Sequence, residues 1–302
     1  MPVQLSPAVG RACDVLELLG ETPAEPQRLA VIARRLDMPR ATCQTVLLAL
    51  CDRGFVVRHE ADISYSLGPA CVRLGEAAAL ASPALAAAAE AVARVAAATG
   101  LAAAVIVRAG DAVQVAETIE GVDPFGPAVA AGLAVPLVAP FGAVFVAWAD
   151  DDVLSAWFDR CDPPLTRTER QRYSRAVDAV RARGYSVSVA PERRQDLLDV
   201  LTADDAGPGG RSAPARDQAV RALAHTEYLP AALDPDRTHR VTQISAPVRD
   251  HHGHVVLALM VVGPAYELAA VEIDALGARL LDAANTVTAQ LGGSPHGLEQ
   301  SA

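Results

Sequence analysis

The chain has 302 residues, enough for two domains of ordinary size and a sizeable core, which excludes a small disulfide-stabilised protein. Its 26 basic residues are all arginine, and with 36 acidic residues they leave a formal net charge of -10. This total excludes a uniformly basic nucleic-acid-binding surface, although it leaves room for a basic patch on an acidic protein.

The five cysteines are widely spaced and form no Cys-x-x-Cys pair, which is typical of apolar side chains in a reducing compartment. The first twenty residues lack the basic start and apolar stretch of a secretion signal, so we expect a cytoplasmic protein. Residues 124–149 carry no charge and are long enough for a membrane helix. Because four prolines and three glycines interrupt them, we interpret them as a buried strand, turn and helix and expect no membrane partner.

Residues 8–75 are predicted to form a compact unit of three helices and a hairpin. Apolar residues at helical spacing predict the helices, which span residues 8–19, 27–36 and 40–53. Alternation over residues 55–68 predicts two short strands joined by a polar turn. This order is typical of a winged helix-turn-helix, whose third helix enters the major groove of DNA. The alternative is a small helical domain for protein contacts.

Local charge distinguishes these two interpretations. Residues 28–58 contain six arginines and two aspartates, a surplus of four positive charges, whereas residues 76–302 carry the entire net charge of -10. Basic charge is therefore concentrated where a DNA-binding face is expected. Leu48, between the apolar and exposed faces of the third helix, is expected to touch a thymine methyl or the hairpin. The candidate DNA-contacting residues are Arg34, Arg35, Arg40, Thr42, Gln44, Thr45 and Arg58.

The remainder of the chain alternates helices and strands. Residues 76–99 predict an alanine-rich linker helix with a helix start at Ser82-Pro83, and its small residues permit packing against a second chain. Further helices are predicted over residues 166–184 and 272–291, and strands over residues 101–122, 185–190 and 242–263. This interleaving predicts an α+β sensor domain. Residues 203–218 have the composition of a flexible loop between two helical patterns, and residues 293–302 are expected to be a disordered tail.

Several stretches resemble the IclR family of bacterial transcription regulators. They are LAVIARRLDMPRATCQTVLLALCDRGFV, YSLGPACVRLG, AVPLVAPFGAVFVAW, the step from LTRTE to VRARGYSV, and ISAPVRDHHGHVVLALMVVGP. The resemblance implies a winged helix-turn-helix over residues 1–75, a linker helix at 76–99, and a GAF/PAS-like α+β effector-binding domain at 100–292. It also implies a homodimer or tetramer on double-stranded operator DNA and a small-molecule effector.

The chain departs from the family pattern at three places. Ala41 and Thr45 replace a serine and an arginine that are frequent at the recognition helix, so one phosphate or base contact is missing. Where the family frequently has a Gly-Lys pair, this chain has Gly142-Ala143. Residues 190–240 form an atypical insertion where the family's ligand loop would lie. We therefore carry over no ligand specificity.

Most apolar residues of the second domain belong to the core, and a minority would line a ligand pocket with a few polar anchors. The candidate effector-contacting residues are Phe125, Phe141, Gly142, Ala143, His225, Tyr228 and Met260, and Arg193 and Arg194 are further candidate anchors. The alternative is an effector domain that only oligomerises and binds no metabolite, which the altered Gly142-Ala143 pair and the insertion favour.

Two other groups of residues suggest different chemistry. Asp250, His251, His252 and His254 are residue types that bind metals, but adjacent side chains of a tight turn do not converge on one ion, so we expect no metal. Cys161 with His225 would be a nucleophile and base, but nothing in the sequence places them together. The sequence thus predicts no enzyme and no cofactor.

Overall fold

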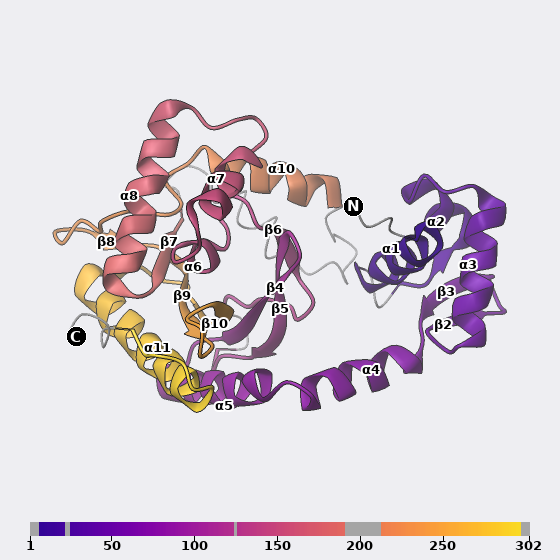
Figure 1. Ribbon diagram of the computed structural model, residues 1–302, viewed down its shortest axis with the longest axis horizontal. Helices are drawn as coiled ribbons and strands as arrows, with labels where there is room; N and C mark the ends of the chain where they lie inside the picture. The colour runs from indigo at the N-terminus through magenta and orange to yellow at the C-terminus, as the bar shows by residue number, and fades with distance from the viewer. Residues whose placement is uncertain (1–5, 22–24, 124–125, 191–212, 297–302) are drawn as a thin grey trace. The chain divides into compact units, whose positions relative to one another are not determined.

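The computed structural model describes residues 6–21, 25–123, 126–190 and 213–296 (Figure 1). They form two compact units, one extending to Ser82 and the other starting at Pro83.

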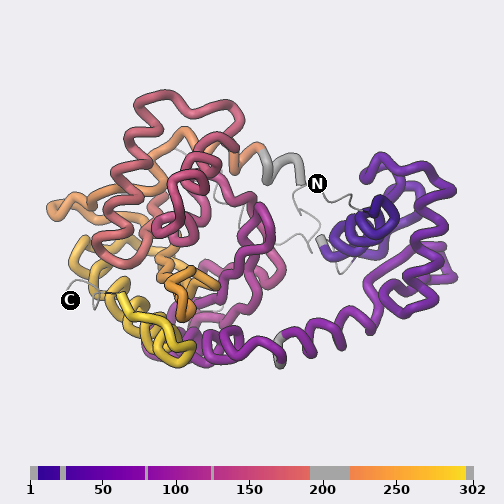
Figure 2. The backbone as a smooth tube through the Cα atoms, viewed as in Figure 1, coloured from indigo at the N-terminus to yellow at the C-terminus, as the bar shows by residue number. Residues whose placement is uncertain are grey.

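The first unit consists of helices and a small antiparallel sheet, whose chain path is drawn in indigo and violet in Figure 2. Its elements are α1 (Pro7–Glu21), β1 (Gln27–Arg28), α2 (Leu29–Arg35), α3 (Arg40–Asp52), β2 (Val56–His59), β3 (Ser64–Leu67) and α4 (Pro69–Leu80). The strand order is β1-β3-β2. Gln27 and Arg28, predicted to start the second helix, instead pair with Tyr65 and Ser64. A backbone pairing with a distant strand leaves no mark on helical periodicity, so the sequence did not reveal it.

The apolar sides of the three helices and the hairpin meet in one core, which includes Val15, Leu18, Leu19, Ile32, Cys43, Leu47, Leu50 and Tyr65. The turn between α2 and α3 is short because Asp37 adopts a left-handed conformation with φ 45°. The Met38 N–H donates to the Ala33 carbonyl at 2.9 Å, which satisfies the end of α2. This turn orients α3 across α2.

Two glycines join the hairpin to the end of α3. Gly54 follows α3 with φ 73°, and the next residue, Phe55, donates its N–H to the Leu50 carbonyl at 2.9 Å. A Cβ atom on Gly68 would lie 2.3 Å from the Gly54 carbonyl oxygen. The Tyr-x-Leu-Gly sequence therefore ends the hairpin at a place where only glycine fits.

The second unit is built on a six-stranded antiparallel sheet of order β6-β5-β4-β10-β9-β7. Its strands are β4 (Ala103–Ala109), β5 (Ala112–Ile119), β6 (Ala134–Pro136), β7 (Ser186–Val189), β9 (Val241–Arg249) and β10 (Val255–Val262), and β8 (Thr238–His239) pairs separately with β11 (Leu268–Ala269). Helices α5 (Pro83–Thr99) and α11 (Ala270–Gln290) pack together against one face of the sheet. The other face is covered by α6 (Ala143–Val146), α7 (Asp151–Asp159), α8 (Arg167–Arg183) and α10 (Ala213–Ala224) (Figure 1).

Both sheet faces are buried, so the strands contribute alternate side chains to two cores. Along β10, Leu257 and Leu259 face α5 and α11, whereas Ala258 and Met260 face the opposite group of helices. The predicted α+β class with an N-terminal winged helix-turn-helix is confirmed.

The structure differs from the sequence expectations at three boundaries. The linker helix expected over residues 76–99 is two helices, because α4 ends at Leu80 and α5 begins at Pro83. α10 begins at Ala213, inside the loop predicted over 203–218, of which residues 203–212 lie outside the described part. At the predicted tail, the His296 N–H donates to Asn285 Oδ1 at 2.9 Å, and residues 297–302 lie outside the described part.

Within the described ranges, no single helix is long and apolar enough to cross a membrane. One broken pair, Pro69–Ala78 with Pro83–Thr99, meets the criteria of length and composition. The uncharged segment at 124–149 contains β6 and α6, and the four residues of α6 are buried in the second unit.

Candidate functional site

Helix α3 has an exposed polar face opposite its buried apolar one. Its inward side chains are Cys43, Leu47 and Leu50. The predicted DNA-contacting side chains of this helix are exposed at Arg40, Gln44 and Thr45 and half-buried at Thr42. The Thr45 hydroxyl donates to the Ala41 carbonyl at 3.0 Å, which leaves its oxygen as an acceptor toward solvent.

Leu48 continues this exposed face one turn after Gln44 and Thr45. Its side chain is 51 % exposed and does not belong to the core cluster of the first unit. An apolar side chain of this size gains nothing from solvent exposure. On a DNA-reading helix, its counterpart is the methyl group of thymine.

The arginines around α3 have unequal surroundings. Arg34 and Arg35 are exposed in the last turn of α2. Arg58 on β2 is also exposed, but its Nη2 atom lies 3.6 Å from Glu60 Oε2. The hairpin turn carries a second carboxylate, Asp62, whose pKa is lowered by a hydrogen bond from the Ser64 hydroxyl at 2.7 Å. The hairpin is therefore less attractive to phosphate than α2 and α3.

A cavity of about 410 Å³ lies within the second unit, between the sheet, the segment that precedes α6, α6 itself and the segment that follows α10. This volume suits a small organic molecule. Its apolar wall includes Ile106, Val113, Val115, Leu133, Val135, Phe141, Phe145 and Met260. Its polar wall includes Ser186, Ser188, Tyr228, Thr242, Gln243 and Ser245.

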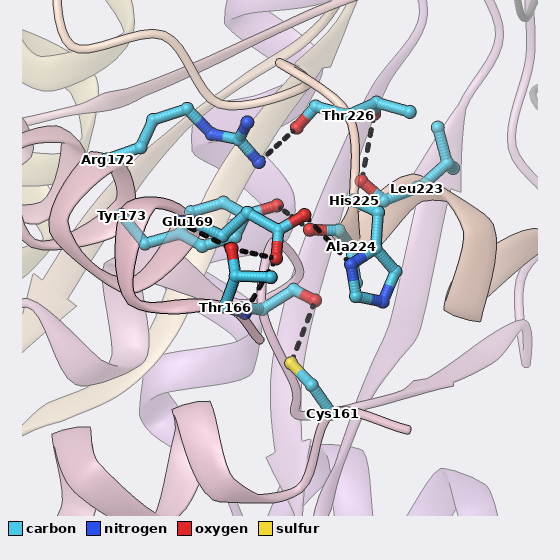
Figure 3. Close-up of polar contacts among 10 residues, drawn as sticks. Cys161, Thr166, Glu169, Arg172, Tyr173, Leu223, Ala224, His225 and Thr226 are labelled. Atoms are coloured by element: carbon cyan, nitrogen blue, oxygen red, sulfur yellow. Dashed lines mark hydrogen bonds and ion pairs between the residues drawn. The ribbon is translucent and has the colours of Figure 1, made fainter. Parts of the chain in front are cut away.

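Five of the predicted effector-contacting residues line this one cavity, namely Phe141, Gly142, Ala143, Tyr228 and Met260. Phe125, Arg193 and Arg194 lie outside the described residues. His225 is not among the lining residues, because its Nδ1 atom lies 2.9 Å from Glu169 Oε1, as Figure 3 shows. The side chain of His225, directly after α10, can point in several directions, and the sequence alone did not distinguish among these directions.

Gly142 shapes the cavity wall at the start of α6. It has φ 72°, and a Cβ atom there would lie 2.4 Å from Leu137 Cδ1. The next residue, Ala143, is 3 % exposed and lines the cavity. The departure from the family's Gly-Lys pair thus makes the wall apolar where a lysine would bring a charge.

The polar strip of the cavity, defined as Ser186, Ser188, Gln243 and Ser245, is absent from the sequence prediction. Ser186 pairs across the sheet with Ser245, and Ser188 pairs with Gln243. Alternation places all four on the sheet face covered by α6, α7, α8 and α10. The signal in the sequence was the period of two in SVSV and in QIS, which also describes a strand with one solvated face.

Tyr228 closes the polar end of the cavity. Its hydroxyl accepts a hydrogen bond from Thr242 Oγ1 at 3.1 Å, and its ring centroid lies 5.7 Å from that of Phe141. Burial raises the pKa of Tyr228, so the phenol remains protonated at neutral pH. Because Thr242 and Ser188 contact its oxygen, the O–H of Tyr228 remains as a donor for a bound molecule.

The N-terminal end of α8 holds the segment that leads to Tyr228 (Figure 3). The Tyr173 hydroxyl donates to the Ala224 carbonyl at 2.8 Å, and Arg172 donates to the Thr226 carbonyl at 2.8 Å. Glu169 accepts from Thr166 in a capping box and contacts His225. Burial opposes its ionisation, but hydrogen bonds from Thr166 and His225 lower the pKa of Glu169 to about 2. These contacts fix the position of the polar end of the cavity.

Neither alternative chemistry has a supporting geometry in the described part of the chain. The Cys161 thiol points to the Ala139 carbonyl at 3.7 Å, as Figure 3 shows, and burial raises its pKa to about 11. Such a thiol is protonated and unreactive at neutral pH. Asp250 Oδ1 accepts the His252 and His254 N–H groups in a turn, and the described residues include no group able to hold a metal ion.

Comparisons with known proteins agree with both units. The IclR helix-turn-helix domain family matches residues 8–60. No curated protein matches the chain. A solved IclR transcriptional regulator from Alicyclobacillus acidocaldarius is 25 % identical, with a TM-score of 0.71, over 96 % of this chain and 100 % of its own.

Two further solved structures show the same fold at lower identity. A putative IclR regulator from Silicibacter sp. has a TM-score of 0.65 at 18 % identity, over 95 % of this chain and 97 % of its own. An IclR family regulator from Brucella abortus has a TM-score of 0.63 at 17 % identity, over 95 % of this chain and 93 % of its own.

The domain match coincides with the elements that build the exposed face of α3, and the structural likeness extends through the second unit. Residues 8–60 form an IclR-type helix-turn-helix domain, and the chain as a whole is similar to solved IclR transcriptional regulators.

Proposed function

We propose that this regulator reads operator DNA with α3 and changes its DNA affinity when a small molecule occupies the cavity of the second unit. The observation that carries the second half of this proposal is the cavity of about 410 Å³ with one apolar and one polar wall. Ligand sites in proteins combine these two features. A unit that served only for oligomerisation would have no need of buried polar groups facing an open space.

The exposed face of α3 supplies the sequence readout. Gln44 has the amide geometry that pairs with adenine, and Leu48 fits a thymine methyl group. Arg40 at the start of the helix, with Arg34 and Arg35 of α2, supplies positive charge for guanine or phosphate. Thr42 and Thr45 add hydroxyl groups on the same side. Arg58 contributes less, because Glu60 lies beside it.

A homodimer or tetramer fits this mode of reading. One helix contacts only a few base pairs, whereas two recognition helices read half-sites about 34–36 Å apart. A ligand that binds one arrangement of the second units better than another changes the spacing of the recognition helices, and thereby the DNA affinity. The mechanism is a coupling of two binding events and contains no catalytic step.

A cytoplasmic location agrees with this function, because operator DNA is found there. The five cysteines are free thiols, as a reducing compartment requires.

The DNA half of the proposal is tested by gel-shift and footprinting on the DNA upstream of the protein's own gene. We expect sequence-specific protection that weakens as salt rises, because arginines contact phosphates. Specific protection should be lost in Arg40→Ala and Gln44→Ala. Wild-type protection in both variants would contradict the assigned role of α3.

The ligand half is tested by thermal-shift screening of small organic molecules, followed by gel shifts with those that raise the Tm. Ala258 faces the cavity, so Ala258→Phe should fill it and abolish the Tm shift. Ser245→Leu fills less space and serves if the first variant does not fold. A screen without any hit, or hits retained in a folded filled-cavity variant, would contradict a ligand site in this cavity.

A further inference from the structure

The polar strip combines three buried serines with the half-buried Gln243, at positions where apolar side chains would cost less to desolvate. Ser186, Ser188 and Ser245 are 5 %, 3 % and 6 % exposed. Their neighbours on the same strands, Val187 and Ile244, are apolar and fill the core on the other face of the sheet. The hydroxyl groups therefore add nothing to the packing of β7 or β9.

The strip is also only partly satisfied by the protein. The Ser188 hydroxyl contacts the Tyr228 hydroxyl. For the side chains of Ser186, Gln243 and Ser245, the described part of the chain offers no hydrogen-bond partner, although all three line the cavity. Buried polar groups in native proteins are paired with protein, water or ligand. The polar atoms of these three side chains are open to the cavity, where water or a bound molecule can pair with them.

The described lining of the cavity carries little charge to complement an ionised ligand. Among its described lining residues, Arg240 is the only arginine, and neither aspartate nor glutamate is present. Arg240 is exposed, so solvent screens it. Burying a carboxylate against the strip, without a paired cation, would be costly. Neutral groups avoid this cost and use the donors and acceptors of serine, glutamine and tyrosine equally well.

The apolar part of the lining lies on the strands farther along the same sheet face and around the start of α6. Ile106 and Val115 come from neighbouring strands, and Phe141 and Phe145 flank the start of α6. The apolar part of a ligand would pack here, where burial of carbon surface supplies most of the binding free energy.

We propose that the effector of this regulator is an uncharged small molecule with a hydrogen-bonding amide, lactone, ester or alcohol group at one end and an apolar body at the other. The uncharged polar group lies on the polar strip beside Tyr228, and the apolar body lies against Phe141 and its neighbours. This inference rests on the proposed function of the cavity and narrows it to one chemical class.

The test uses pairs of compounds that share a carbon skeleton and differ in charge. Binding to the full chain is measured by thermal shift and calorimetry at pH 7.5. The pairs are benzamide with benzoate, phenylacetamide with phenylacetate, and hexanamide with hexanoate. We expect the amides to bind at least about ten-fold more tightly than their carboxylates, with an affinity that does not depend on salt.

Variants identify where the neutral group binds. Ser186→Ala and Ser245→Ala, combined, remove two hydroxyl groups and should weaken amide binding by about ten-fold or more. Thr286→Ala, on the exposed side of α11, removes a hydroxyl far from the lining residues and should change nothing. Arg240→Ala should leave amide binding unchanged.

Three results would overturn the inference. Tighter binding of the carboxylates, lost in Arg240→Ala, would show that the cavity takes anions, and the ligand-responsive function would survive. An unchanged affinity for the amides in the combined Ser186→Ala and Ser245→Ala variant would show that the polar strip does not bind the ligand. If neither member of any pair binds, and the wider screen on the unaltered chain also gives no hit, the proposed function fails together with the ligand class.

Discussion

The exposed face of α3 and the cavity of the second unit both depend on polar side chains, but in opposite surroundings. Gln44 and Thr45 are exposed, so water satisfies them when DNA is absent. Ser186 and Ser245 are 5 % and 6 % exposed and lack a side-chain partner in the described part of the chain. A polar group on a surface thus carries little information by itself. In a cavity, a polar group without a protein partner has a desolvation free energy that only water or a ligand offsets.

The strongest way to separate the two regions is to damage the first unit alone. In Gly68→Ala, the new Cβ would lie 2.3 Å from the Gly54 carbonyl oxygen, and the hairpin would have to move away from α3. We expect the first unit to lose about 3 kcal/mol of unfolding free energy, measured by urea denaturation, and to lose specific DNA binding.

Gly10→Ala is the matched control, because a Cβ at Gly10 in α1 meets no atom within 4 Å. It should stabilise the helix by about 1 kcal/mol or less. Ligand binding in the second unit should be unaffected by both variants. Wild-type stability of Gly68→Ala would contradict the tight contact between the hairpin and α3.

The second prediction removes contacts from the exposed face of α3 without disturbing its core. Gln44→Ala and Arg40→Ala should each cost about 1–3 kcal/mol of operator affinity, because a base contact is lost, with the melting temperature unchanged. Quantitative gel shifts measure this. Arg279→Ala, exposed on α11, removes the same charge from the second unit and should bind DNA like the wild type. An equal loss in Arg40→Ala and Arg279→Ala would reduce the effect of Arg40 to net charge.

The third prediction concerns the clamp, by which we mean the contacts of Glu169, Arg172 and Tyr173 on α8 with the segment that leads to Tyr228. Burial acts against ionisation of Glu169, but hydrogen bonds from Thr166 and His225 bring its pKa from 4.5 to about 2. Because the folded pKa lies below the unfolded one, this stabilisation is present above about pH 4.5 and is lost as the pH falls toward 2. Glu169→Gln should lower the free energy of unfolding by about 1–2 kcal/mol at pH 7.

Urea denaturation at several pH values measures this difference, which should shrink between pH 5 and pH 3. Glu90→Gln is the control, because Glu90 and its partner Arg94 on α5 are both exposed. A pH-independent effect of Glu169→Gln would mean that packing, not charge, holds the clamp.

The smallest expected effect lies in the hairpin. Glu60→Ala removes the carboxylate 3.6 Å from Arg58 Nη2 and frees this charge for phosphate. Because exposed ion pairs contribute about 0–1 kcal/mol, we expect operator affinity to rise only by about two- to five-fold at low salt. The plot of affinity against salt should become steeper. Unchanged affinity and slope would place the hairpin outside the DNA interface.

Local patterns predicted most of the elements in both units. The period of 3.6 located α1, α3, α8 and α11, and the cap at Thr166 and the stop at Gly184 agree with the observed ends of α8. Such features depend on hydrogen bonds and packing within one turn of helix, which neighbouring residues determine. The same holds for Pro83 at the start of α5.

The candidate sites were predictable to different degrees. The polar face of α3 could be predicted because helical spacing alone separates Gln44 from Cys43 and Leu47. Phe141 and Tyr228 were expected at a pocket, and they line the same cavity. The polar strip was missed, and His225 points to Glu169 instead. Strand alternation shows which residues share a face but does not show what covers that face.

The sequence by itself determined the order of the elements, the local charge of residues 28–58 and the exposed face of α3, because each depends on residues close together in the chain. Only the tertiary structure decided that β7 and β9 lie side by side, with Ser186 opposite Ser245. These two serines are 59 positions apart in the sequence. Whether a hydroxyl group lies in water or in a cavity depends on the helices packed above it, and that packing is a property of the whole second unit.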